Sequence, residues 1–305
     1  MKAMRIHGWG EPPRLEELPE PAPQPGRSLV KMAATTASHL DRSIAAGGFL
    51  RHPPLPYVPG VEASGIVLQS ERFDIGTRVW LRGAGLGTAA DGTWRETISA
   101  PDAALGLLPE AISMPLGAAF FSPCTAAWVA LFEVGAVKAG ERVLVSGASG
   151  AVGGVAVQLA RDAGAEVGIV GADDGNDQRP FDLLIDAVGG PPLAGLLARL
   201  APGGRAVLVG YTAGRSVELD LAELMQRDLR LLPLNMLRRE AAARAAVPEL
   251  LARLVDGRLE LALRTFPLSQ AAEALAWIAE RGHRGRAVLV PDVSPSPRAA
   301  GRGLG

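Results

Sequence analysis

The pattern of apolar and polar residues changes near residue 118. Before this point, short runs of β-type composition are separated by Pro and Gly, and they cover 28–34, 63–68, 78–82 and 94–100. Short strands between turn residues are typical of an irregular β-barrel or sandwich. The first part of the chain is therefore predicted to form a β domain.

After residue 118, short apolar runs alternate with segments rich in Ala and Leu. Strands are predicted at 142–146, 166–170, 181–186, 205–209 and 229–234, and helices at 151–163, 192–200 and 240–256. This alternation indicates βαβ units and a parallel sheet. A final strand at 286–291 is a candidate for a return to the first domain, and the tail 292–305 is predicted to be disordered because it lacks apolar periodicity.

Length, charge and cysteine content narrow the class of protein. The 305 residues suffice for about two domains of ~150 residues each. The 31 basic and 32 acidic side chains give a net charge of −1, which argues against nucleic acid or an anionic membrane surface as the main partner. The single cysteine, Cys124, excludes an internal disulfide and a Cys-based structural zinc site. The start has no apolar signal segment and the longest uncharged stretch, 111–132, contains Pro115 and Pro123, so a cytoplasmic protein without a membrane segment is expected.

A glycine-rich turn follows the strand 142–146 and precedes the helix 151–163. Glycines at such a turn let the backbone approach a pyrophosphate, and the start of the helix offers free N–H groups to it. In this position the turn indicates a dinucleotide-binding site, with a merely tight strand-to-helix turn as the alternative. The candidate cofactor residues of the turn are Gly147, Ser149, Gly150, Ala151, Val152 and Gly153.

Ser149 also meets one requirement of a hydrolase nucleophile, because it lies on a strand-to-helix turn. The nucleophile-elbow pattern requires Gly where this chain has Ala151, and His283 is the only histidine further along the chain. A serine hydrolase is therefore disfavoured.

Several further segments share a family pattern with the glycine turn. They are ASHLDRSIAAGGF (37–49), PYVPGVEASGIV (56–67), FDIGTRVW (73–80), DGTWRETI (91–98), SPCTAAWVAL (122–131), FDLLIDAVGG (181–190), GGRAVLVGYTAG (203–214) and GRAVLVPD (285–292). Over about residues 1–290 the chain resembles the medium-chain dehydrogenase/reductase superfamily, in particular its zinc-free quinone oxidoreductase branch related to zeta-crystallin.

The resemblance implies an α/β protein with two domains. A GroES-like β-barrel substrate domain would comprise 1–117 and 261–291, and a doubly wound parallel-sheet Rossmann domain would comprise 118–260. A nicotinamide cofactor, NAD(H) or NADP(H), would meet a small-molecule substrate in a cleft between the domains. Relatives contact the nicotinamide half of the cofactor at the positions of Thr125, Gly210 and Tyr211. A homodimer through the strand near 229–234 is expected on the same grounds.

The resemblance also bears on zinc. Relatives that use this metal place its ligands where this chain has Ser38, Val61 and Phe121. None of these side chains is a competent zinc ligand in such a site. This implies zinc-independent chemistry on a conjugated carbonyl or quinone, in which hydride reaches the β-carbon and the resulting enolate is stabilised and protonated.

The catalytic candidates are the polar residues near the expected cleft. Quinone reductases often carry Tyr where this chain has Phe49 and Asn where it has Ser38, so an apolar wall replaces one phenolic donor. The remaining candidates are Ser38, His39, Asp41 and Tyr57. Structural roles are the alternatives: His39 as a solvated loop residue, Asp41 as a helix cap, and Tyr57 as a packing aromatic with its hydroxyl in water.

Only ten residues, 171–180, separate the strand 166–170 from the strand 181–186, where family members carry a helix, a strand and a further helix. Ten extended residues reach about 33 Å, and the return to the next strand needs roughly 19 Å. The sheet is therefore predicted to lack one edge strand and its helices, together with much of the wall around adenine. A partner subunit or another segment is expected to cover the exposed part of the sheet.

The short connection is acidic. Asp173 falls 20 residues after Gly153, where NAD-binding folds place an acid that reads the ribose, and Asp174 and Asp177 follow it. Carboxylates repel the 2′-phosphate of NADP, so the sequence favours NAD(H) over NADP(H). A solvated acidic turn is the alternative.

Two functions from different classes remain. The first is a zinc-independent NAD(P)H-dependent reductase of an enone or quinone, supported by the glycine turn. The second is an enzyme of the same fold that has lost redox function and its cofactor and performs a cyclisation, dehydration or isomerisation, supported by the lost adenine wall and by Phe49. A pure binding or scaffold protein has no feature in its favour. Fold alone does not decide between them, and we favour the first.

Overall fold

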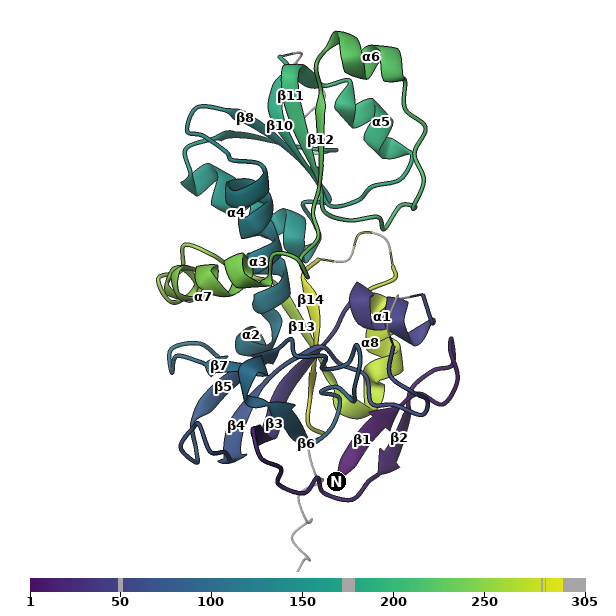
Figure 1. Ribbon diagram of the computed structural model, residues 1–305, viewed down its shortest axis with the longest axis vertical. Coiled ribbons are helices and arrows are strands. Elements are labelled where there is room, and N and C mark those ends of the chain that lie inside the picture. The colour runs from purple at the N-terminus through teal and green to yellow at the C-terminus, as the bar shows by residue number, and fades with distance from the viewer. Residues whose placement is uncertain (49–51, 172–178, 281, 283, 293–305) are drawn as a thin grey trace, which may run out of the picture. The chain divides into compact units, whose positions relative to one another are not determined.

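The computed structural model describes residues 1–48, 52–171, 179–280, 282 and 284–292. The chain divides into two compact units (Figure 1). Unit 1 comprises 1–108, 265–279 and 287–305, and unit 2 comprises 109–264 and 280–286. The boundaries therefore fall at 109 and 265, whereas the sequence analysis put them at 118 and 261.

Unit 1 is built around a sheet of seven strands. Its elements, two of which begin in unit 2, are β1 (Lys2–Arg5), β2 (Arg14–Glu17), β3 (Arg27–Ala37), α1 (His39–Ala45), β4 (Glu62–Gln69), β5 (Arg78–Arg82), β6 (Thr97–Pro101), η1 (Asp102–Ala104), β7 (Leu105–Leu107), β13 (Leu263–Pro267), η3 (Leu268–Gln270), α8 (Ala271–Trp277) and β14 (Arg286–Val290). The strand order is β13-β14-β3-β4-β5-β7, and β6 also pairs with β3.

The last strand of the chain completes unit 1. β14 pairs antiparallel with β3, with Ala287 opposite Ala37. Its buried side chains join a core that includes Val30, Trp94 and Ile98. The final strand, a candidate for a return to the first domain, thus pairs with β3 of unit 1, and burial of Ala287 and Leu289 in this core favours the pairing.

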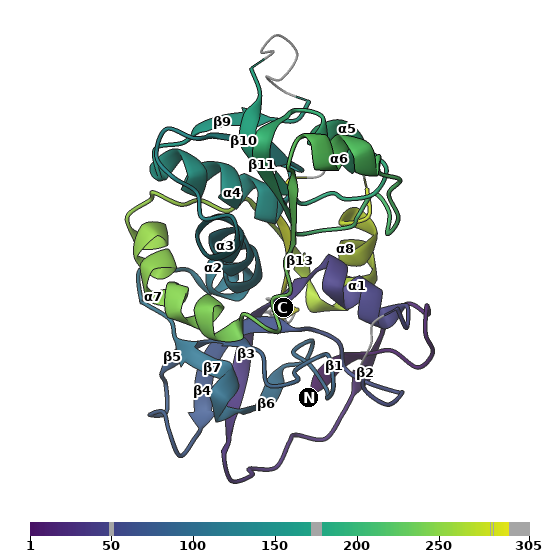
Figure 2. The same ribbon diagram turned by 45° about the horizontal axis from the view of Figure 1, so that its top comes forward.

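Unit 2 is built around a parallel sheet of five strands. Its elements are α2 (Met114–Ala119), α3 (Phe121–Trp128), the π-helical turn η2 (Val129–Val134), β8 (Arg142–Ser146), α4 (Ala151–Asp162), β9 (Glu166–Ile169), β10 (Phe181–Asp186), α5 (Pro192–Leu197), β11 (Leu200–Leu208), α6 (Leu221–Gln226), β12 (Arg230–Pro233) and α7 (Glu240–Val255). Helices α3 and α4 lie on one side of the sheet and α5 and α6 on the other, as Figures 1 and 2 show.

The order of the parallel strands is β12-β11-β10-β8-β9. Among the residues that the structure describes, β9 is thus an edge strand, and the next described strand along the chain, β10, lies on the other side of β8. This confirms the predicted α/β fold with a parallel sheet that lacks one edge strand. The expected cover over the exposed face stays a prediction, and the side chains of Val167 and Ile169 on β9 are half-buried.

Two predicted elements have different bounds. The strand expected at 94–100 begins only at Thr97, because Trp94 turns inward and its indole N–H donates to the carbonyl of Thr36 at 2.8 Å. The helix expected at 192–200 ends at Leu197, because Leu200 already pairs with Phe181 in the sheet.

Side-chain contacts hold the end of the short connection, just before β10, against the sheet. Arg179 forms an ion pair with Glu166 of β9 at 2.6 Å, and the Arg142 guanidinium lies 4.4 Å from the centre of the Phe181 ring. A Cβ at Gly168 would lie 2.6 Å from that same ring. The aromatic ring therefore packs directly on the backbone of the edge strand, and only glycine leaves room for it.

A buried arginine ties the sheet of unit 2 to the turn before β8. The guanidinium of Arg205 on β11 donates to both carboxylate oxygens of Glu141, at 2.7 and 3.0 Å, and to the backbone carbonyl of Ala136 at 3.1 Å. The hydrogen bond from Arg205 lowers the pKa of the Glu141 carboxyl, and the charges of Arg205 and Lys138 act in the same direction.

Replacing Glu141 by Gln tests this contact. A carboxyl whose pKa is lowered by folding stabilises the folded state above its ordinary value of 4.5, and this contribution is lost as the pH falls through the folded pKa. We expect Glu141→Gln to lower the midpoint of urea unfolding at pH 7, with a difference from wild type that shrinks below pH 4.5. Glu240→Gln, which breaks a surface pair with Arg244, is the control. A difference that stays constant with pH would contradict the assignment.

Candidate functional site

The glycine turn of unit 2 connects β8 to α4. A Cβ at Gly153 would lie 2.3 Å from the carbonyl oxygen of Gly147, and Gly147 itself has a φ of +66°. The first turn of α4 can pack this closely on the preceding turn only because residue 153 has no side chain. The predicted strand, tight turn and helix are therefore present with the packing that a dinucleotide fold uses.

The start of α4 can accept a phosphate. Its N-cap is Gly150, so no side chain caps the helix, and its first turn contains no acidic residue. The free N–H groups and the helix dipole favour an anion at this end of a twelve-residue helix. Ser149 is exposed on the turn, and Ala151 and Val152 form the half-buried first residues of the helix. The residues present thus fit the pyrophosphate of a nicotinamide dinucleotide.

A buried carboxylate lies beneath this turn. Asp186, the last residue of β10, is 1% exposed, and its Oδ1 accepts a hydrogen bond from the hydroxyl of Ser146 at 2.5 Å. The backbone N–H groups of Val188 and Gly189 also donate to this carboxylate, at 3.1 Å each. The Ser146 hydroxyl in turn accepts from the N–H of Ala187 at 3.0 Å. The end of β8 and the loop after β10 are therefore held together by one side chain.

The sequence analysis missed both Ser146 and Asp186. Each ends a predicted strand, and a polar residue at the carboxyl end of two neighbouring parallel strands was the available signal. This signal was not sufficient, because two strand ends come together only if their strands are neighbours in the sheet. The order of strands in the sheet cannot be read from the sequence.

The loop after β11 carries Gly210 and Tyr211. Gly210 donates its N–H to the backbone carbonyl of Asp186 at 3.2 Å, so it lies beside the loop after β10. Tyr211 is 56% exposed, and the guanidinium of Arg215 lies 5.7 Å from the centre of its ring. Both residues are at the carboxyl end of the sheet, where open α/β folds bind ligands.

Two cofactor candidates remain, Thr125 and Asp173. Thr125 is completely buried in α3, and its hydroxyl donates to the carbonyl of Phe121 at 2.7 Å within the same helix. Asp173 lies outside the described residues. A contact of either residue with a cofactor stays a prediction.

The catalytic candidates Ser38, His39 and Asp41 open helix α1 in unit 1. Ser38 is the N-cap: its hydroxyl donates to Asp41 at 2.5 Å, and the Asp41 carboxylate also accepts from the backbone N–H of Ser38 at 2.9 Å. The helix-cap role considered for Asp41 is confirmed in the form of a reciprocal capping box. His39 is the exposed first residue of the helix rather than a loop residue.

Tyr57, the fourth catalytic candidate, lies in the core of unit 1. It is 1% exposed, and its ring centre lies 5.8 Å from that of Trp9. Its hydroxyl is buried and has no hydrogen-bond partner among the described residues, so the expected placement of this hydroxyl in water is wrong. Burial, and next the charge of Asp41, raise the pKa of Tyr57. The phenol therefore remains a neutral donor group.

The positions that match zinc ligands have other roles. Ser38 forms the helix cap, and Val61 is buried in an apolar cluster with Ile6, Ile44 and Tyr57. Phe121, the third position, is a buried residue at the start of α3, and its ring centre lies 6.1 Å from that of Phe120. Phe49, which replaces the Tyr of the quinone reductases, lies outside the described residues. Within the described part of the chain, no group of three His, Cys, Asp or Glu side chains could hold a metal ion. No helix of that same part is long and apolar enough to cross a membrane.

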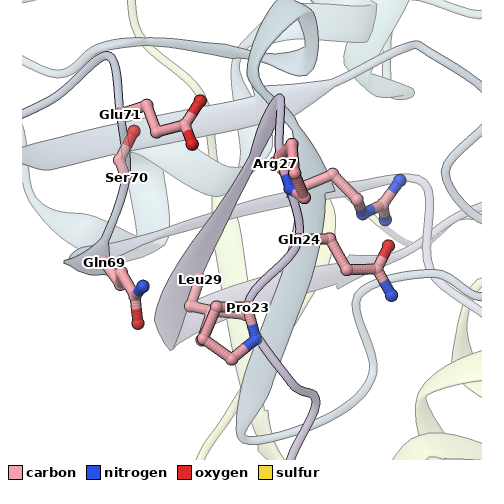
Figure 3. Close-up of a pocket in the computed structure, with 8 residues that line it drawn as sticks. Pro23, Gln24, Arg27, Leu29, Gln69, Ser70 and Glu71 are labelled. Carbon is pink, nitrogen blue, oxygen red and sulfur yellow. The ribbon is translucent and has the colours of Figure 1, made fainter.

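One shallow pocket of about 180 Å³ lies in unit 1, away from these residues (Figure 3). Its walls come from the segment before β3 and the end of β4. They are formed by Pro23, Gln24, Pro25, Arg27, Leu29, Gln69, Ser70 and Glu71. None of these is a candidate site residue.

Comparison with known proteins agrees with this geometry. Residues 24–110 match the family model of the alcohol dehydrogenase GroES-like domain, and residues 164–289 match that of the zinc-binding dehydrogenases. The quinone oxidoreductase of Homo sapiens is 28% identical over 75% of this chain and 78% of its own. A zinc-type alcohol dehydrogenase-like protein of Schizosaccharomyces pombe, C337.11, is 30% identical over 78% of this chain and 79% of its own.

A solved structure shows the same fold. The quinone oxidoreductase from Thermus thermophilus, also solved in complex with NADPH, superposes with a TM-score of 0.76 at 29% identity, over 95% of this chain and 100% of that one. Its likeness extends over both units, and the two family models together cover parts of both units. The sheet of unit 1, the parallel sheet of unit 2 and these matches show that the chain belongs to the medium-chain dehydrogenase/reductase superfamily, as a quinone oxidoreductase-like member.

Proposed function

We propose that the protein is a zinc-independent, NAD(P)H-dependent reductase of an enone or quinone. The close packing of Gly153 on Gly147 carries this proposal, because it keeps the uncapped start of α4 available to a pyrophosphate. The oxidoreductase relatives support the same reading. The absence of zinc chemistry rests on Ser38 and Val61, which offer a capping hydroxyl and an aliphatic side chain in place of metal ligands.

When bound, a nicotinamide supplies hydride to the β-carbon of a conjugated carbonyl, which leaves an enolate to be stabilised and protonated. We propose different roles for the four catalytic candidates of unit 1. Ser38 and Asp41 bond to each other and fix the start of α1. His39, exposed at this start, is the group we propose as proton donor, whereas the buried phenol of Tyr57, whose pKa is raised by burial, is the weaker acid.

The non-redox alternative is not favoured. It needs a nucleotide site that has decayed, whereas the turn, the uncapped helix and the buried carboxylate beneath them are all present. We therefore propose cofactor-dependent chemistry with a small conjugated carbonyl or quinone as substrate.

The cofactor can be tested directly. Titration of the purified protein with NADH and with NADPH, followed by nicotinamide fluorescence, is expected to show saturable binding of both, with NADH the tighter because Asp173, Asp174 and Asp177 repel a 2′-phosphate. Tighter binding of NADPH would remove the proposed role of Asp173. Absence of binding by either at millimolar concentration would overturn the reductase itself.

His39 and Asp41 are separated by substitution. We expect His39→Ala to lower kcat for reduction of 1,4-naphthoquinone by about 10²-fold with an unchanged Tm, as for loss of a general acid. Asp41→Ala should instead lower the Tm, because it removes half of the capping box. His7→Ala, at another exposed histidine of unit 1, is the control. Full turnover of His39→Ala would exclude this residue from the mechanism.

We further propose a homodimer through the edge strand β12. Leu237, just after this strand, is 76% exposed and Met225, just before it, is 75% exposed, and an edge strand offers unpaired backbone groups to a second copy. Multi-angle light scattering is expected to give twice the chain mass, and Leu237→Glu should shift the protein toward monomer. Ile75→Glu, at an equally exposed residue of unit 1, should not. A monomeric wild type would refute the proposal.

A further inference from the structure

The two halves of the sheet in unit 2 are unequal. Dinucleotide folds consist of two mononucleotide-binding halves of three strands each. In the described residues, β10, β11 and β12 form a complete half, whereas the half that contains the glycine turn has only β8 and β9. Eleven residues, 170–180, separate β9 from β10, and a crossover with its helix alone needs about ten to twelve. A third strand with its helices therefore does not fit into this chain.

The buried carboxylate fixes the loops of the complete half and joins them to the end of β8. Asp186 accepts hydrogen bonds from Ser146 at the end of β8 and from Val188 and Gly189 after β10. Its backbone carbonyl accepts from Val209 and Gly210 after β11, at 2.8 and 3.2 Å. Three strand ends are thus fixed to one residue, and the loops after β10 and β11 belong to the complete half, where the nicotinamide side of the nucleotide would be held.

We propose that this chain recognises its cofactor chiefly through the nicotinamide ribose phosphate, with Ser146 and Asp186 as positioning residues, and gains little from adenosine. This rests on the proposed function and deepens it. The physical reason is that tight binding requires ordered protein groups around each part of the ligand. In the described residues such groups are the loops after β10 and β11, on the nicotinamide side of the dinucleotide. Ser146 and Asp186 do not touch the cofactor; they fix the loops that do.

The two halves of the dinucleotide provide matched probes. Reduced nicotinamide mononucleotide and AMP each carry one phosphate monoester, so they differ only in the base. We expect the wild-type protein to bind reduced nicotinamide mononucleotide at least tenfold more tightly than AMP, measured by nicotinamide fluorescence and by competition. Equal or tighter binding of AMP overturns the proposal, and this contrast does not depend on any variant.

Ser146→Ala tests the positioning role. It is expected to weaken binding of reduced nicotinamide mononucleotide about tenfold and to weaken binding of AMP by less, because the glycine turn after Ser146 would hold the phosphate of either nucleotide whereas the loops after β10 and β11 would hold only the nicotinamide side. The control is Ser28→Ala in unit 1, because Ser28 is equally buried and donates to Asp102 at 2.6 Å, far along the chain from the glycine turn. It should cost similar thermal stability without changing either affinity. Equal effects of the two variants on nucleotide binding would show that Ser146 is merely structural and overturn its assignment.

The outcomes separate this inference from the proposed function. If the wild type binds NADH and AMP tightly but the mononucleotide weakly, the reductase stands and the inference falls. If the wild type binds no nicotinamide nucleotide, both fall. Selective loss of the nicotinamide half in Ser146→Ala supports both.

Discussion

The hydrogen bonds of the Asp186 carboxylate are the constraint on which the nucleotide-binding end of unit 2 depends. A buried carboxylate is stable only when its lone pairs are satisfied, and here the Ser146 hydroxyl and two backbone N–H groups do this. Those donors come from two different strand ends, so satisfying the charge also fixes their separation. The glycine turn begins directly after Ser146, so the position of Ser146 also fixes the start of the turn.

The short connection between β9 and β10 shows how a parallel sheet tolerates the loss of an element. The strands next to the missing element are held together by two sets of contacts. The Phe181 ring packs on Gly168 and on the Arg142 guanidinium, and Arg179 forms an ion pair with Glu166. These contacts fix β9 to the rest of the sheet, and its outer edge is not paired with another strand in the described residues. Stability is therefore retained at the amino ends of the strands, while nucleotide chemistry is carried by their carboxyl ends.

In unit 1, local stability and chemistry compete for the same residues. The capping box gives Ser38 and Asp41 to the start of α1, which is where the superfamily resemblance suggested catalytic groups. Tyr57 stays neutral because its environment disfavours a phenolate. His39 is the candidate that the fold leaves at the surface, so helix formation at 38–45 itself narrows the choice of proton donor.

The sequence by itself determined the alternation of strands and helices, the glycine turn and the shortened connection, because periodicity, glycine spacing and segment length can be read along the chain. The superfamily was identified from the sequence through the resemblance of its motifs. Strands 142–146 and 181–186 were predicted with their observed bounds. Only the tertiary structure decided that Ser146 and Asp186 face each other and that Tyr57 is buried. The physical reason is that hydrogen bonds between residues forty positions apart depend on which strands become neighbours, and that order follows from packing of the whole unit.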